Sequence, residues 1–220
     1  SNYIKEYLDK AFKLNTDVIP NPIDIPNIVL PVIKNNKKQI VSVNNGFSNL
    51  KNVRSLIIAF SEVLKVFPDY ELLLIGKQYG ANDAAEKWAK DNARNKNIRF
   101  LGIIDSTKVV SIVSSSTLLA HASLEESFGN PLIEAMSVGI PVLGGDKSGA
   151  VPWVLDYGKA GFLVDVTKPS EIAKAIITLL SNSDLLQEYS TNGFNNVMHR
   201  FITSVVINLH INKYLEILKK

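Results

Sequence analysis

The sequence contains no cysteine among its 220 residues, which excludes disulfide bonds, thiolate metal sites and a cysteine nucleophile. No apolar run approaches the ~18 residues that a membrane-spanning helix needs, and the first residues lack the pattern of a secretory leader. The four arginines are scattered and the formal net charge is only +3, so the basic stripe typical of nucleic-acid-binding proteins is missing. We therefore expect a cytoplasmic protein that has no nucleic-acid partner and touches the inner face of a membrane at most peripherally.

Most of the chain alternates between short apolar runs and longer amphipathic segments. Six runs are apolar on both faces and rich in β-branched residues, as buried parallel strands are; they lie at residues 38–43, 71–75, 98–101, 117–121, 140–143 and 161–164. Helical patterns lie at about 51–67, 81–95, 105–115, 131–138, 149–156 and 169–181. Asp105 and Ser170 are the expected N-caps of two of these helices.

This alternation predicts an α/β fold, a doubly wound, six-stranded, Rossmann-like parallel sheet with helices on both faces. In such a sheet ligands bind beyond the carboxyl ends of the strands. Residues 1–26 fall outside the pattern and are predicted to form a helix followed by a stiff, proline-rich linker between domains. Residues 27–182 would form the α/β domain, and residues 183–220 two terminal helices broken near 199–201.

The backbone around Gly129 has the features of an anion site. Glycine permits an unusual backbone angle or a close approach by a ligand, and Pro131 suits the first turn of a helix. The free N–H groups expected at residues 130–133, together with the helix dipole, would attract a phosphate.

Two carboxylates, Glu126 and Glu134, flank this anion site. A carboxylate accepts paired hydrogen bonds from vicinal hydroxyls, so a ribose or sugar ring is a natural partner. From these residues alone two interpretations stay open. The segment either binds a nucleotide sugar, or its acids merely complement a helix N-terminus and residues 129–131 are only a loop.

The stretch Glu126-Ser-Phe-Gly-Asn-Pro-Leu-Ile-Glu134, with the Glu-Ala-Met and Gly-Ile-Pro-Val that follow it, resembles the Glu-x7-Glu signature of retaining glycosyltransferases of the GT-B fold. The resemblance is to the large GT4-like family, the glycosyl transferases of group 1. It implies that the chain is the C-terminal, donor-binding domain and that Glu134 holds the nucleotide ribose. It also implies that Glu126 contacts the donor sugar near the reacting centre, and that the backbone amides of residues 128–132 face the sugar and the phosphates.

Further landmarks follow in the family's order. Lys51, before Asn52, resembles the lysine that binds the donor diphosphate, and the backbone after Gly102 would meet the base. Phe47 follows the glycine of the first loop, where the family often has an arginine. Trp153 replaces the acid of the family's Gly-Gly-x-Pro-Glu element. By resemblance the donor-binding residues are Gly46, Phe47, Lys51, Gly76, Ile103, Ile104, Glu126, Ser127, Phe128, Gly129, Asn130, Pro131, Leu132 and Glu134, with Glu126 and Lys51 also catalytic.

The resemblance implies a hexosyltransferase that moves a sugar from a UDP-, GDP- or ADP-sugar to an acceptor hydroxyl with retention of configuration. Polysaccharide, lipopolysaccharide and glycolipid synthesis are all compatible with it. A missing N-terminal domain would bind the acceptor glycan or glycolipid, so we expect the isolated chain to transfer poorly. No cofactor or metal is expected, and we interpret His121 as a packing residue. The alternatives are a GT-B-fold sugar-nucleotide epimerase and a non-catalytic donor-binding subunit.

Overall fold

A computed structural model describes residues 1–24 and 37–219. Its centre is one parallel sheet in the order β3-β2-β1-β4-β5-β6. The strands are β1 (Lys37–Val43), β2 (Glu71–Ile75), β3 (Ile98–Gly102), β4 (Ser116–His121), β5 (Val142–Gly145) and β6 (Phe162–Val164). In the register, Val41 of β1 lies beside Leu73 of β2 and Leu119 of β4. The predicted fold class, a six-stranded Rossmann-like α/β sheet, is confirmed.

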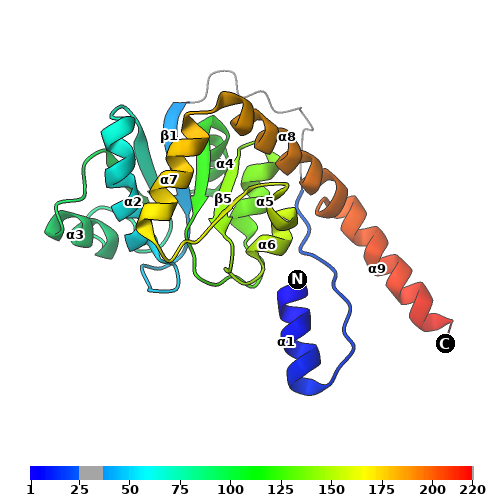
Figure 1. Cartoon of the computed structure of the whole chain (residues 1–220). Coiled ribbons are helices and arrows are strands. Elements are labelled where there is room, and N and C mark those ends of the chain that lie inside the picture. The colour runs from blue at the N-terminus through cyan, green and yellow to red at the C-terminus, as the bar shows by residue number, and fades with distance from the viewer. Residues whose placement is uncertain (25–36, 220) are drawn as a thin grey trace.

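Helices cover both faces of the sheet (Figure 1). On one face α2 (Val53–Val66), α3 (Ala84–Asp91) and α7 (Pro169–Leu180) enclose one apolar core. On the other face α4 (Ser106–Ser115), α5 (Asn130–Ser137), the single turn α6 (Val151–Val154) and the end of α8 (Ser183–Arg200) enclose a second core. A 3-10 turn, η1 (Asp156–Gly158), follows α6. Both faces of the strands are therefore buried, as their continuous apolar runs require.

Several local predictions can be compared with the structure. Asp105 caps α4, because its side chain accepts a hydrogen bond from the Thr107 amide, so that prediction is confirmed. The prediction for Ser170 was wrong: Pro169 already has the backbone angle of a helix and starts α7, so Lys168 is the cap. The strand predicted at 140–143 begins two residues later, at Val142, since Pro141 has no N–H to donate to a sheet.

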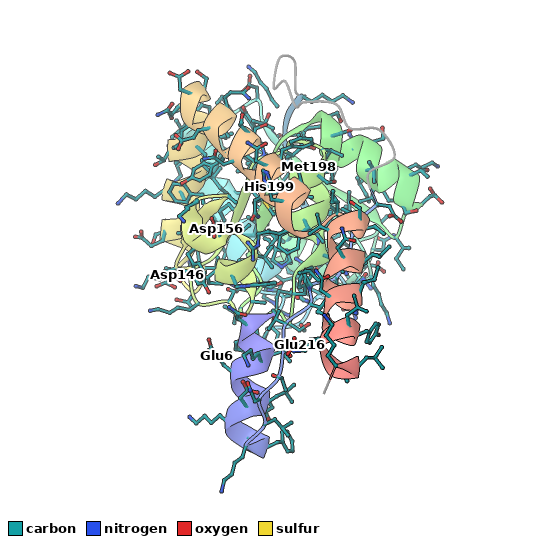
Figure 2. The ribbon with its side chains drawn as sticks, turned by 90° about the vertical axis from the view of Figure 1, so that its right-hand side faces the viewer. Glu6, Asp146, Asp156, Met198, His199 and Glu216 are labelled. Carbon is teal, nitrogen blue, oxygen red and sulfur yellow. The ribbon has the colours of Figure 1, made fainter. Side chains whose placement is uncertain are left out.

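The terminal segments lie beside one another at one end of the domain. Ile23 pairs with Ile202 between α8 and α9 (Thr203–Leu218), and Lys213 of α9 forms an ion pair with Asp17, with 2.6 Å between Nζ and Oδ2. Figures 1 and 2 show α1 (Asn2–Phe12) and α9 extending from the same side of the α/β layers. The predicted boundary at residues 26 and 27 lies outside the described residues.

The helix α9 leaves much apolar surface in contact with solvent. Its exposed apolar residues are Ile207, Leu209, Ile211, Tyr214, Leu215, Ile217 and Leu218. Even so, none of the helices in the described part of the chain has both the length and the apolarity needed to cross a bilayer. A helix this apolar on its exposed sides calls for a covering partner.

Candidate functional site

A cavity of about 1020 Å³ opens at the carboxyl ends of β1, β2 and β4. The strand order reverses between β1 and β4, and a doubly wound sheet forms its ligand crevice at such a switch point. Val43 and Ile75 supply an apolar wall from the strands, and Ile104, Val109 and Val110 continue it beside the start of α4. The opposite wall is the polar loop before α5. The cavity therefore has an apolar slot on one side and charged groups on the other, as nucleotide sites do.

The cavity brings together most of the residues that the sequence predicted for donor binding. Those that line it are Lys51, Gly76, Ile103, Ile104, Glu126, Ser127, Phe128, Gly129, Asn130, Pro131 and Glu134. Gly46, Phe47 and Leu132 are outside the lining. Phe47 packs against the rings of Tyr79 and Trp88, while Leu132 is fully buried in the core beneath α5. A donor contact by these three residues remains a prediction.

The first turn of α5 forms the floor of the polar side. Gly129, the residue before the helix, has φ = +96°, which a glycine adopts without strain. Pro131 has no N–H, as expected. The amide of Leu132 donates to the Gly129 carbonyl at 3.0 Å, so the prediction of a free amide was wrong for Leu132. The amide of Asn130 has no acceptor among the described residues, so it can face an anion, aided by the helix dipole.

The charged centre of the cavity is the carboxylate of Glu126. Its Oε1 lies 2.7 Å from Nζ of Lys51 and 3.1 Å from Nε2 of His121. Burial alone would raise the pKa of Glu126, but hydrogen bonds from His121, Lys51 and Ser123 outweigh it and lower the pKa to about 2. Glu126 is therefore a fixed negative charge, and Lys51 a cation within reach of any phosphate that enters.

The second glutamate, Glu134, stands one turn into α5 and lines the same cavity. Partial desolvation by the surrounding walls raises its pKa. It makes no ion pair within 1–24 and 37–219. Its carboxylate is thus available to accept hydrogen bonds from the hydroxyls of a ligand.

The sequence interpretation missed the place of His121 in the site, along with lining residues such as Asn44 and Asn45. His121 ends β4, is 1% exposed, and lines the cavity while contacting Glu126. A signal was present, because His121 is a polar residue at the carboxyl end of a buried strand. The interpretation as a packing residue accounts for its burial but not for its contact with a carboxylate.

In the described part of the chain, no three or more His, Cys, Asp or Glu side chains gather where they could hold a metal ion. Among the described residues that line the cavity, Lys51 is the one lysine or arginine, and its Nζ lies 2.7 Å from Oε1 of Glu126.

Comparisons with known proteins agree with this geometry. Residues 29–196 match the model of the family described as glycosyl transferases group 1. The N-acetyl-alpha-D-glucosaminyl L-malate synthase of Bacillus anthracis is 27% identical over 192 residues, which are 85% of this chain and 48% of that protein. The chain spans about half the length of the curated relatives it matches.

Two solved structures have the same fold. The sucrose-phosphate synthase of Thermosynechococcus elongatus superposes with a TM-score of 0.82 at 22% identity, covering 100% of this chain and 57% of that one. An Anabaena protein in complex with UDP-glucose superposes with a TM-score of 0.68 at 24% identity, covering 84% of this chain and 50% of that one. At these identities the likeness concerns the fold.

Replacing Gly149 with alanine should displace the backbone of Glu126. Gly149 has φ = +59°, and a Cβ there would lie 2.5 Å from the carbonyl oxygen of Glu126. Gly158 is the matched control, because its φ is +97° but its added Cβ would meet Leu163 at an ordinary 3.7 Å. Urea unfolding should show Gly149→Ala to be less stable than Gly158→Ala by about 1 kcal/mol or more. Equal losses would mean that the contact between the two loops does not hold Glu126 in place.

The low pKa of Glu126 predicts how stability changes with pH. With a folded-state pKa of about 2 against an ordinary value of 4.5, the stability that the ionised group contributes is present above about pH 4.5 and lost toward pH 2. Urea unfolding should find Glu126→Gln less stable than the unaltered chain by about 1–3 kcal/mol at pH 7, with a smaller gap at pH 3. Glu125→Gln, at the exposed neighbour, is the control. The same gap at both pH values would rule out an ionised, hydrogen-bonded Glu126.

Proposed function

Because the chain belongs to the glycosyl transferases group 1 family, we propose that it binds a nucleoside diphosphate sugar and serves its transfer to an acceptor hydroxyl. The observation that carries the proposal is the convergence of Lys51, Glu126 and the start of α5 in one cavity at the switch point of the sheet. A cation and a helix N-terminus suit a diphosphate. Two carboxylates beside them suit the hydroxyls of a ribose and of a sugar.

In this proposal each wall of the cavity has one partner on the donor. The base enters the apolar slot near Ile103 and Ile104, the ribose is held by Glu134, and the sugar lies against Glu126. The diphosphate lies between them, over the Asn130 amide and within reach of Lys51. Lys51 and the dipole of α5 then stabilise the negative charge that develops on the departing diphosphate, which is the main catalytic contribution expected of preorganised charge.

The stereochemistry, the metal requirement and the nucleotide of the reaction are proposed as follows. Retention of configuration is supported by the spacing of Glu126 and Glu134, the signature that this chain shares with retaining enzymes. We propose that the reaction uses no metal, because Lys51 and the α5 dipole supply positive charge at the diphosphate. UDP is the first nucleotide to test, since an Anabaena protein of the same fold was crystallised with UDP-glucose.

We further propose that the acceptor is bound by a domain outside this chain. The chain spans about half the length of its relatives, and α1 and α9 extend on the side where the carboxyl ends of the strands open (Figure 1). Ser1 and Tyr3, at the start of α1, bond to Ser127 and Glu125 in the loop beside the cavity. A second domain on this side would cover the apolar residues of α9 and complete the site, so the isolated chain should bind donor but transfer slowly. The acceptor would be a growing polysaccharide, lipopolysaccharide or glycolipid.

Calorimetric titration with UDP, GDP, ADP and their sugars tests the donor site directly. One nucleotide should bind, and Glu134→Ala should weaken its binding by about 1–3 kcal/mol, because the ribose loses its carboxylate partner. Glu171→Ala is the control, since Glu171 stands near the start of another helix, α7, on the opposite face of the sheet. The proposal fails if none of the nucleotides binds, or if both variants lose affinity equally.

A further inference from the structure

The two side chains that contact the carboxylate oxygen Oε1 of Glu126 differ in how easily they can move. Lys51 reaches it from the turn before α2 on a long side chain that is 26% exposed. His121 reaches it from β4, where it is 1% exposed and paired in the sheet with Gly144 of β5. A lysine ammonium can turn to a new anion at the cost of a few bond rotations, whereas the imidazole on a central strand stays where the sheet holds it.

The protonation of His121 follows from its second nitrogen. Nδ1 is buried and has no hydrogen-bond partner among the described residues. A buried N–H without an acceptor is costly, so the imidazole carries its proton on Nε2, toward Glu126, and leaves Nδ1 as a bare acceptor. His121 thereby donates from Nε2 to one oxygen of the Glu126 carboxylate.

The donor diphosphate and Glu126 compete for Lys51. Under the proposed function the diphosphate enters the cavity that Lys51 lines, and its charge draws the ammonium away from Oε1. Glu126, whose side chain is 14% exposed, then keeps the bond from Nε2 of His121. Without that bond only Ser123 would still hold the carboxylate, which could then follow Lys51 or rotate toward solvent.

We propose that His121 is a positioning residue that holds Glu126 toward the donor sugar while Lys51 binds the diphosphate. This role rests on the proposed function and assigns separate tasks to the two partners of Glu126. The flexible lysine binds the phosphate, and the rigid histidine holds the carboxylate that recognises the sugar. His121 therefore contributes to the recognition of the sugar rather than of the nucleotide.

The backbone of Glu126 is fixed independently of its side chain. The amide of Ala150 donates to the Glu126 carbonyl at 2.8 Å, and Gly149 packs directly against the same carbonyl. The remaining freedom is in the side-chain torsions, which the bond to His121 restricts. A variant at His121 can therefore misdirect the carboxylate without moving the loop.

Replacing His121 with glutamine and with asparagine separates positioning from packing. The amide nitrogen of glutamine is as many bonds from the backbone as Nε2, while that of asparagine corresponds to Nδ1 and falls short of Glu126. Both keep a buried polar group of similar size, so thermal melting should show similar folding. His199→Asn, at an exposed histidine of α8, is the control.

The readout is the ratio of affinities for UDP-glucose and UDP, or for the sugar and nucleotide that the titration panel identifies. We expect His121→Asn to lower this ratio about tenfold, His121→Gln to keep it within about twofold, and His199→Asn to leave it unchanged. Nitrogen NMR of the unaltered chain at neutral pH should place the His121 proton on Nε2. Losses that arise from general unfolding affect both ligands and cancel in the ratio.

The positioning role of His121 can fail while the proposed donor site stands, and the experiment distinguishes the two failures. If the chain binds both ligands and His121→Asn leaves their ratio unchanged, the positioning role is overturned while the donor site stands. A proton on Nδ1 instead of Nε2 overturns it as well. If no nucleotide or nucleotide sugar binds the unaltered chain, the proposed function fails, and the role of His121 fails with it.

Discussion

The ion pair between Lys51 and Glu126 joins two loops that are 75 residues apart in the chain. A largely buried carboxylate without partners would be costly and would gain a proton. Lys51, His121 and Ser123 keep it ionised; Lys51 comes from the segment after β1, His121 ends β4, and Ser123 follows it. The ion pair can form only because β1 and β4 are neighbours in the sheet. The other residues of the site are arranged around it.

The same constraint explains where the cavity lies. Since all six strands are parallel, their carboxyl ends meet at one edge, and the order reverses between β1 and β4. The N-terminus of α5 points toward the cavity, and the left-handed backbone of Gly129 allows the tight turn before the helix. The terminal helices α1 and α9 leave the domain on this side, so a covering domain would close the cavity and bury the apolar face of α9 in one step.

Much of this arrangement could be predicted from the sequence, and the exceptions have physical causes. The alternating strand and helix patterns predicted the sheet, because the spacing of apolar residues and the length of each apolar run reflect which faces are buried. The spacing of Glu126 and Glu134 predicted two residues that line the cavity. The convergence on Glu126 could not be derived, because the strand order that brings Lys51 beside it from 75 residues away leaves no local trace in the sequence. The packing of Phe47 could not be foreseen for a similar reason: its ring contacts Tyr79 and Trp88, which come from a later part of the chain.

A crystal structure of the chain with UDP-glucose is the decisive test of the donor site. We expect the diphosphate over the first turn of α5, with Nζ of Lys51 moved from Glu126 to a phosphate oxygen and the ribose hydroxyls on Glu134. We also expect Nε2 of His121 still to contact Glu126 while the carboxylate faces the sugar. A nucleotide bound away from this cavity, or Lys51 still paired with Glu126 beside a bound diphosphate, would contradict this donor site.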